Sequence, residues 1–426
     1  MAYAAELAVV IFLAVYALIV SEKIHRTIAA ILGASFLFIF GITDQTEAVR
    51  AIDFNTLGLL IGMMMIVAIT AETGLFRFAA IWTVKKTRGK PLLALAAFCL
   101  ITAFASAFLD NVTTVLLIVP VTFSICRMLG ISPLPFLLME IFASNIGGTA
   151  TLIGDPPNLM IGSANRELTF MAFLDNLSII CLIILALVFL FVALLYRKQL
   201  RSAKDRHLNL ASLDAKEEIT DKVLLIKCLF VLCLTIGGFF AHQWLHMETA
   251  TIALIGAFLL LLLTGGKSLE RAFAGVEWPT IFFFIGLFVL VSGLVKTGVI
   301  AGLAREALAL TGGSTLNTSF LILWFSGLAS AFVDNIPLVA AMIPLIKEMG
   351  KLGLTQLDPV WWSLSLGACL GGNGTLIGAS ANVVVSAMAA KEGVHISFAR
   401  FLLIGFPVML ISLAASSVYL YLRYFG

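Results

Sequence analysis

The strongest constraint on this chain is a succession of apolar blocks, each close to the length needed to cross a lipid bilayer. Blocks near 5–20, 27–41, 56–74 and 172–196 contain few charged residues, and a helix needs ~20 apolar residues to span the hydrocarbon core. Of 426 residues, 61% are hydrophobic and 12% are charged, about half the charged share of a soluble domain. A water-soluble fold would expose too much apolar surface. We therefore expect an all-α polytopic membrane protein.

Two polar motifs occur twice at one offset. The offset is 224 residues, the separation of Asp110-Asn111 from Asp334-Asn335, and it also carries GGTATLIGDPPN (147–158) onto GGNGTLIGASAN (371–382) without insertion or deletion. Chance does not supply two polar motifs in one register, so the pattern indicates an internal duplication, which is typical of secondary transporters. The predicted parts are a first repeat at 1–196, a cytoplasmic linker at 197–222 and a second repeat at 223–426.

The orientation of the two repeats depends on the segment 91–126. Its two apolar runs, 91–109 and 112–126, are short and have polar residues between them, which favours a re-entrant hairpin that enters and leaves on one face. Each half then has five crossings, so the second repeat is inverted. If 91–126 instead crosses the membrane continuously, each half has an even number of crossings and the repeats are parallel.

Basic residues favour the inverted arrangement. With the N-terminus outside, the inner face receives the loop with Lys23 and Arg26, the cluster at 85–90 and the basic part of the linker, whereas the outer loop at 44–53 leans acidic. The prediction is ten transmembrane helices and two oppositely entering hairpins in the cell (inner) membrane, with both termini outside. The linker is either a solvated connector or a small helix in which Lys216 pairs with acidic neighbours.

Three acidic residues within apolar surroundings mark the candidate site. An ionisable side chain in a membrane helix costs roughly 2.5–3.5 kcal/mol on insertion scales, so Asp110, Asp155 and Asp334 need a buried polar environment. The hairpin tips, with Asp110 and Asp334, are expected to line the substrate path. The glycines and prolines of the second motif predict broken helices at 145–158 and 369–382, whose unpaired backbone groups can address a ligand.

The predicted substrate- or ion-binding residues are those that carry oxygen or amide groups in the two motifs. They are Ser106, Asp110, Asn111, Asn145, Thr149, Thr151, Asp155, Asn158, Ser330, Asp334, Asn335, Asn373, Thr375 and Asn382. Asp110 and Asp334 are also the predicted proton-coupling residues. The six cysteines are scattered, so no metal site or cofactor is predicted, and no nucleic-acid partner is expected.

Structural alternatives exist for several of these residues. Each Asp-Asn pair could cap a helix, because both residue types are favoured at N-caps, and Asp155 could cap the second half of its broken helix. Asn145, whose offset position is Cys369, could be a helix-packing hydrogen bonder. Asp155 itself occurs in one repeat only, since the equivalent residue is Ala379.

At these residues the chain resembles the ArsB/NhaD group of the ion transporter superfamily, which includes arsenite pumps, sodium/proton antiporters and the melanosomal P protein. The resemblance is carried by SAFLDNVTT (106–114), NIGGTATLIGDPPN (145–158), SAFVDN (330–335) and GGNGTLIG (371–378), and the GDPPN form is most similar to the P-protein branch. It implies ten helices, two hairpins and an elevator-like motion, with an arsenical ATPase subunit as a candidate partner. Dicarboxylate relatives typically carry Ser-Asn-Thr at these tips, so a dicarboxylate substrate is disfavoured.

The leading hypothesis is proton-coupled efflux of arsenite or antimonite as the neutral hydroxide. Asn111, Asn335 and the threonines of the broken helices would satisfy its hydroxyl groups. Asp110 and Asp334 would exchange protons, because burial favours the neutral form of a carboxyl. The alternatives are a sodium/proton antiporter, which hard oxygen ligands suit, and an anion pathway of P-protein type.

An enzymatic alternative is an intramembrane hydrolase that uses Asp110 and Asp334 as an aspartyl dyad. Each aspartate has its own asparagine and its own hairpin, and the hairpins are expected to enter from opposite faces. No enzymatic activity is therefore predicted.

Overall fold

The computed structural model describes all residues except 1, 22, 88–89, 202–214 and 267, and its described part is built of helices without a strand. In chain order the elements are α1 (Ala2–Ser21), α2 (Arg26–Ile39), α3 (Gln45–Ala51), α4 (Phe54–Ala71), α5 (Leu75–Lys86), α6 (Pro91–Ser106), α7 (Asn111–Leu129), α8 (Leu134–Thr149), α9 (Pro156–Ala164), α10 (Phe170–Leu195), α11 (Arg197–Arg201), the 3-10 helix η2 (Ala215–Glu218), α12 (Lys222–Leu245), α13 (Thr249–Leu263), α14 (Leu269–Ala274), α15 (Trp278–Lys296), α16 (Val299–Thr311), α17 (Thr315–Ser330), α18 (Asn335–Lys351), α19 (Asp358–Gly371), α20 (Ser380–Lys391) and α21 (Phe398–Tyr424).

The expected all-helical membrane fold is confirmed. Among the described residues, seven helices are long and apolar enough to span a bilayer: α1, α4, α7, α10, α12, α15 and α21. The pair α16 and α17, bent by 117°, would make an eighth span, and α2, α6 and α13 are shorter apolar helices. The total of ten crossings stays a prediction.

Two segments differ in detail from the sequence-based expectation. The basic cluster at 85–90 was expected to be a break, but α5 continues to Lys86, where two lysines in its last turn complement the negative end of the helix dipole. The linker begins with α11 and ends with η2. Arg88, Lys204 and Arg206 lie outside the described residues, and the expected pairing of Lys216 lies outside the described side chains.

Two helix pairs pack through glycine contacts at equivalent places. On α4, a Cβ added to Gly62 would lie 2.7 Å from the carbonyl carbon of Ala253 on α13. On α15, a Cβ added to Gly286 would lie 2.7 Å from the carbonyl carbon of Ala30 on α2. Gly62 and Gly286 are separated by the 224-residue offset. Both pairs therefore rely on an absent side chain for close backbone approach.

A second set of equivalent contacts joins α6 to α8 and α17 to α19. The Ser106 hydroxyl donates to the Ser144 carbonyl at 2.6 Å, and the Ser330 hydroxyl donates to the Ala368 carbonyl at 2.6 Å. A Cβ on Gly147 would meet the backbone of Ala103, and one on Gly371 would meet the backbone of Gly327. Positions 224 residues apart thus make the same hydrogen bonds and the same close approaches.

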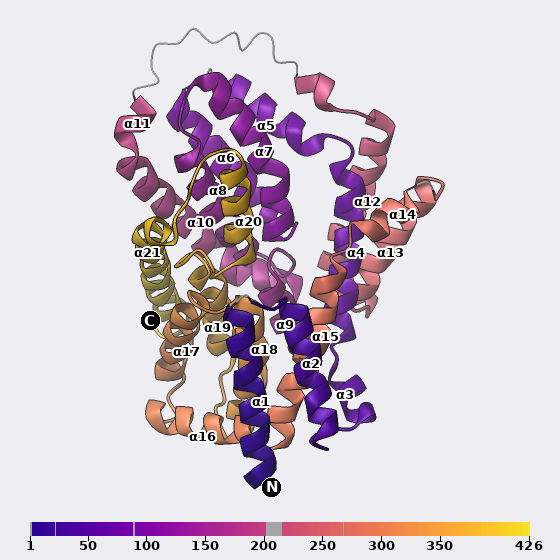
Figure 1. Ribbon diagram of the computed structural model, residues 1–426, viewed down its shortest axis with the longest axis vertical. Helices are drawn as coiled ribbons and strands as arrows, with labels where there is room; N and C mark the ends of the chain where they lie inside the picture. Colours follow the sequence, from indigo (N-terminus) through magenta and orange to yellow (C-terminus); the bar gives the residue numbers. More distant parts are fainter. Residues whose placement is uncertain (1, 22, 88–89, 202–214, 267) are drawn as a thin grey trace.

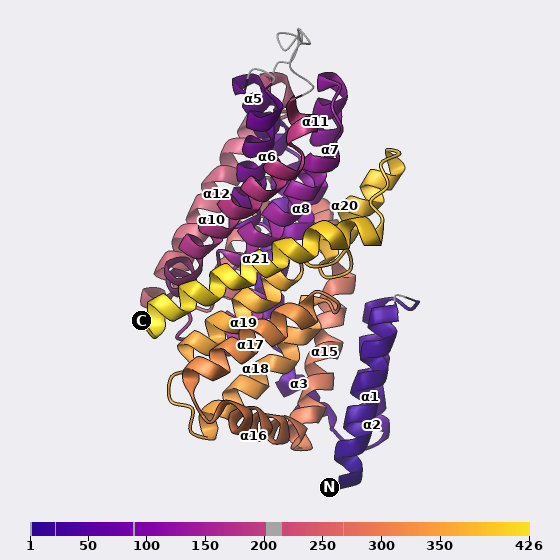
Figure 2. The same ribbon diagram turned by 90° about the vertical axis from the view of Figure 1, so that its left-hand side faces the viewer.

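The helices that follow the two Asp-Asn motifs lie in opposite parts of the molecule. Figures 1 and 2 show α5, α6 and α7 gathered at the top, whereas α16, α17 and α18 occupy the lower part. The broken segments between α8 and α9 and between α19 and α20 lie between these two parts, near mid-height (Figure 1). This arrangement brings helix ends from both halves to one central region.

Candidate substrate site between the two hairpin tips

Both Asp-Asn motifs lie at helix N-termini, as the capping alternative expects. Asp110 is the N-cap of α7 and accepts a hydrogen bond from the backbone N–H of Thr113 at 2.8 Å. Asp334 is the N-cap of α18 and accepts from the backbone N–H of Ile336 at 3.1 Å. Each carboxylate therefore satisfies orphan backbone donors, and each retains an oxygen atom for other partners.

A cavity of about 30 Å³ lies between the two tips. It is lined by polar groups from several helices, namely Arg26, Asp110, Asn111, Asp155, Glu277, Thr280, Asn335 and Ser380, together with Leu60, Met64, Val112, Pro156 and Ile336. A water molecule needs roughly 10–15 Å³ measured in this way, so the cavity has room for about two. Asp110, Asn111, Asp155 and Asn335 were predicted from the sequence, and the structure brings all four to one place.

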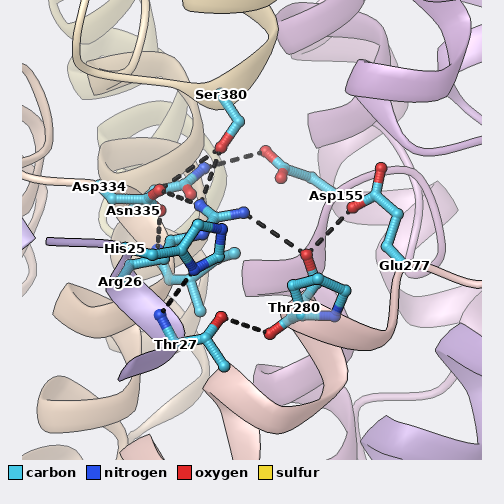
Figure 3. A network of polar contacts seen from close by, with 11 residues as sticks. His25, Arg26, Thr27, Asp155, Glu277, Thr280, Asp334, Asn335 and Ser380 are labelled. Carbon is cyan, nitrogen blue, oxygen red and sulfur yellow. Dashed lines mark hydrogen bonds and ion pairs between the residues drawn. The ribbon is translucent and has the colours of Figure 1, made fainter. Parts of the chain in front are cut away.

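Arg26 is the single basic residue among the described residues that line this cavity. Its guanidinium forms an ion pair with Asp334 at 2.8 Å, donates to the Ser380 hydroxyl at 3.0 Å and lies 5.2 Å from the ring centre of Phe283 (Figure 3). The side chains of Arg26 and Asp334 are 27% and 14% exposed. Arg26 thus neutralises one aspartate of the predicted pair, whereas Asp110 forms no ion pair with any described residue.

Arg26 and Ser380 also line a second, larger cleft of about 370 Å³, which includes His25 and Asp334. The small cavity and this cleft therefore share the contact between Arg26 and Ser380 at the start of α20. Figure 3 shows Arg26 reaching across this junction toward Asp334 and Ser380 on one side and Thr280 on the other. The ion pair stands where the cavity would open into the cleft.

Asp155 occupies the N-cap position of α9, but its side chain forms no cap hydrogen bond. The side chain is 1% exposed, and its Oδ2 accepts from the Asn335 amide at 3.4 Å, which links it to the opposite tip (Figure 3). The capping alternative for Asp155 therefore lacks its defining contact. A buried carboxyl that does not close the helix end needs another explanation.

A chain of buried amides connects the two broken helices. Asn111 donates to Asn145 at 3.1 Å, and the Asn145 amide donates to Asn373 at 3.0 Å and to Asn382 at 3.1 Å. Asn145 thus contacts the first hairpin tip and the second broken helix together. Asn145 is therefore a hydrogen bonder between helices, as the packing alternative expects. The helices that it joins are those that surround the candidate site.

Six other predicted residues hold the backbone of the broken segments. The hydroxyls of Ser106 and Ser330 donate to backbone carbonyls of α8 and α19. The hydroxyls of Thr149, Thr151 and Thr375 donate to the carbonyls of Asn145, Ala107 and Ala331, respectively. The Asn158 amide donates to the carbonyls of Thr149 and Thr151. None of these six lines the small cavity among the described residues. They fix the shape of the loops that carry Asp155 and Ser380.

Sequence reasoning missed four polar residues of the cavity: Arg26, Glu277, Thr280 and Ser380. Arg26 was treated only as a charge that orients the loop. A signal for two others was present, because the 224-residue offset carries Asp53 onto Glu277 and Thr56 onto Thr280. In both places the threonine hydroxyl donates to the acidic side chain, at 2.6 Å to Asp53 and at 3.0 Å to Glu277.

Several known proteins similar to this chain are named as transporters. The family model described as CitMHS, citrate transporter, matches residues 16–367. An uncharacterized transporter of Mycobacterium tuberculosis is 44% identical over 424 residues, which are 98% of this chain and 98% of that protein. The P protein of Mus musculus is 36% identical over 497 residues, covering 97% of this chain and 59% of the P protein.

A solved structure has the same overall arrangement. The YdaH transporter of Alcanivorax borkumensis superposes with a TM-score of 0.60, covers 98% of both chains and is 16% identical in sequence. At that identity the similarity concerns the fold alone. The fold of this chain is therefore one found in a membrane transporter.

Proposed function

Since the chain belongs to the CitMHS family of membrane transporters, we propose that it is a proton-coupled secondary transporter of a small solute that carries no negative charge. The observation that carries this proposal is the charge of the central cavity. Asp110, Asp155 and Glu277 line it, whereas its one cation, Arg26, is already paired with Asp334. An acidic, nearly closed cavity attracts cations and protons and repels anions.

Citrate, which the family description names, fits this cavity poorly as a free anion. Its carboxylates would face the carboxylates of Asp110 and Asp155 without a free basic group among the described lining residues. Like charges at short range in a region of low dielectric are strongly unfavourable. Arsenite or antimonite, as a neutral trihydroxide, would instead donate to these carboxylates and accept from Asn111 and Asn335.

The proton carriers in this proposal are Asp110 and Asp155. The sequence-based hypothesis assigned coupling to Asp110 and Asp334, but the carboxylate of Asp334 is already paired with the guanidinium of Arg26. Asp110 and Asp155 have neutral hydrogen-bond partners, Thr113 and Asn335. A proton on either one would remove a buried negative charge and leave a hydroxyl that can donate to the solute.

Alternating access would follow from the duplicated architecture. The repeated contacts of Ser106 and Ser330, and the location of α7 and α18 in opposite parts of the molecule, support two inverted repeats at 1–196 and 223–426. In this scheme the ion pair of Arg26 with Asp334 closes the cavity toward the 370 Å³ cleft. Separation of the pair would open that side.

A sodium/proton antiporter is the second candidate. Asp110, Asp155 and Glu277 offer hard oxygen ligands to one cavity that holds a single cation, and Na⁺ would compete with protons for the same oxygens. Sodium transport would then need no additional residues. The two candidates differ in the solute and share the site.

Vesicles reconstituted with the purified protein and a trapped pH dye distinguish them. Arsenite, antimonite, Na⁺ or citrate is added outside the vesicles, one solute in each experiment, and the dye records proton movement. We expect arsenite or antimonite to move protons, and we expect Asp110→Asn and Asp155→Asn to reduce the rate at least tenfold. Asp175→Asn is the matched control, because Asp175 pairs with Arg423 away from the cavity and is 68% exposed.

The alternatives have distinct results in this assay. Proton movement with Na⁺ and none with arsenite or antimonite would establish the second candidate. Coupled citrate uptake that survives both substitutions would contradict the proposal.

A further inference from the structure

One further acidic residue, outside the cavity, is buried in the first half of the molecule. Glu140 lies in the middle of α8 and is fully buried, with 0% of the residue exposed. One of its oxygens accepts a hydrogen bond from the Thr122 hydroxyl of α7. The other, Oε2, is buried and has no hydrogen-bond partner among the described residues.

Glu140 forms no ion pair with a basic side chain among the described residues. None of the seven ion pairs between described residues involves Glu140. Titratable groups that interact electrostatically with it include the thiols of Cys99 on α6 and Cys126 on α7, which are themselves buried. An isolated carboxylate in such a place is very costly. The geometry therefore favours the neutral acid at Glu140.

Glu140 lies on the same helix interface as the site. Asn111, Thr114, Ile118 and Thr122 are spaced by three or four residues, so they follow one face of α7. Asn111 on this face bonds to Asn145 of α8, and Thr122 bonds to Glu140 of α8. Between them, the Thr114 hydroxyl is buried and without a partner among the described residues. We call Asn111, Thr114 and Thr122 the polar line; it extends along α7 for about 16 Å from the cavity edge to Glu140, with the apolar Ile118 between Thr114 and Thr122.

The second half of the chain shows that the fold does not require this polar line. At the 224-residue offset, Thr114, Thr122 and Glu140 correspond to Leu338, Ile346 and Leu364, which are all buried. The same helix interface is therefore packed with apolar side chains in the second half. A buried acid with an unused oxygen is no better for stability than an apolar residue of similar size, so the polarity of the first half calls for a functional reason.

We propose that Glu140 is a second proton-binding site, which stores one proton in the first helix bundle and exchanges it with the central cavity during transport. In the exchange, the O–H bond at Glu140 breaks, the proton binds to an oxygen of Asp110 or Asp155, and the electron pair stays on the Glu140 carboxylate, which keeps the hydrogen bond from Thr122. The Thr114 and Thr122 hydroxyls line the route. This inference rests on the proposed function in assuming that the cavity carboxyls handle protons.

The first test observes the proton on Glu140 directly and needs no transported solute. Infrared difference spectra of the purified protein are recorded between acidic and alkaline pH, and the carbonyl stretch of protonated carboxyl groups is followed. We expect one carboxyl band to disappear in Glu140→Gln, which keeps the shape of the side chain and its acceptor for Thr122. An unchanged set of bands in Glu140→Gln would overturn the proposal.

The second test separates a proton-binding role from a structural one. Glu140→Leu copies Leu364 of the second half, and we expect its unfolding temperature to be equal to or above that of the unsubstituted protein. In vesicles, solute exchange at equal pH is expected to persist in Glu140→Leu and Glu140→Gln, whereas uptake driven by a pH gradient falls at least tenfold. A lowered unfolding temperature together with unchanged coupling would show that Glu140 is structural.

The two proposals fail in different ways. If no tested solute moves protons but the Glu140 band titrates, the proposed substrates are wrong and the proton site stands. If solutes move protons equally well in both Glu140 variants, coupling operates without Glu140.

Thr122→Val serves as a further variant, because it removes the hydrogen bond from the Thr122 hydroxyl to Glu140 and leaves the acid in place. We expect it to shift the pH dependence of uptake without abolishing uptake.

Discussion

At the scale of single residues, the site depends on which polar groups are free and which are already used. Asp110 and Asp334 have the same motif and the same capping position, yet only Asp334 pairs with Arg26. The hydroxyls of Ser106 and Ser330 donate to backbone carbonyls and do not face the cavity. Residue type alone therefore does not separate a ligand from a structural hydrogen bonder, because the difference lies in the partner.

Asp155 offers a prediction at this scale. Because the Asp155 side chain makes no cap hydrogen bond and asparagine keeps an oxygen that can accept from Asn335, we expect Asp155→Asn to change the free energy of unfolding by no more than about 1 kcal/mol and to reduce coupled transport at least tenfold. Thr169→Ala is the comparison, since the Thr169 hydroxyl accepts the Ala172 N–H at the start of α10. Its loss costs about 1 kcal/mol and is expected to leave transport intact.

Thermal unfolding in detergent and transport in vesicles measure the two effects separately. The reverse pattern, with Asp155→Asn destabilised and transport retained, would assign Asp155 to the helix end and remove it from the site.

At the scale of helices, two close-packed pairs form the part of the protein that carries Arg26 and Glu277. α2 and α15 approach at Gly286, and α4 and α13 approach at Gly62. Arg26 begins α2 and Glu277 is the N-cap of α15, so this packing sets the distance between Arg26, which pairs with Asp334, and Glu277 in the cavity lining. A displacement of either helix would move both groups.

The glycine contacts give the prediction at this scale. Gly62→Ala and Gly286→Ala are each expected to destabilise the protein by about 1–3 kcal/mol, because the new methyl group would overlap backbone atoms of the partner helix. Gly302→Ala in α16 is the control. A Cβ there has no neighbour within 4 Å, and alanine favours a helix over glycine by up to about 1 kcal/mol.

Unfolding temperatures of the three variants provide the comparison. Equal stability of Gly62→Ala, Gly286→Ala and Gly302→Ala would mean that these helix pairs are not held at the observed separation.

At the scale of the whole molecule, the orientation in the membrane is set by charge and remains a proposal. We expect the end with α5, α11 and η2 to face the cytoplasm, because Lys85, Lys86 and Lys90 lie there, and the end with α3 to face outward (Figure 1). Gln45→Cys and Glu217→Cys place thiols at exposed positions on the two ends.

A membrane-impermeant maleimide applied to intact cells tests this orientation. Gln45→Cys is expected to react from outside, and Glu217→Cys is expected to react only after permeabilisation, with the unsubstituted protein as the measure of background from its six cysteines. Labelling of Glu217→Cys in intact cells, with protection of Gln45→Cys, would reverse the proposed topology.

The sequence by itself determined the helical membrane fold, because apolar blocks of bilayer length leave the backbone no other way to satisfy its hydrogen bonds. It also identified Asp110, Asn111, Asp155 and Asn335, because isolated polar groups are costly among apolar neighbours. Local composition suffices for both conclusions, since each depends only on how a segment partitions between water and lipid.

Only the tertiary structure decided which of these groups act together. Arg26 precedes Asp334 by 308 residues, and no local pattern records that the two meet or that Asp110 forms no ion pair with any described residue. The same holds for Glu140, which reads as one polar residue in an apolar helix until Thr122 and the unpartnered oxygen are seen. Pairing depends on the packing of helices that are distant in the chain, and no local sequence pattern records that packing.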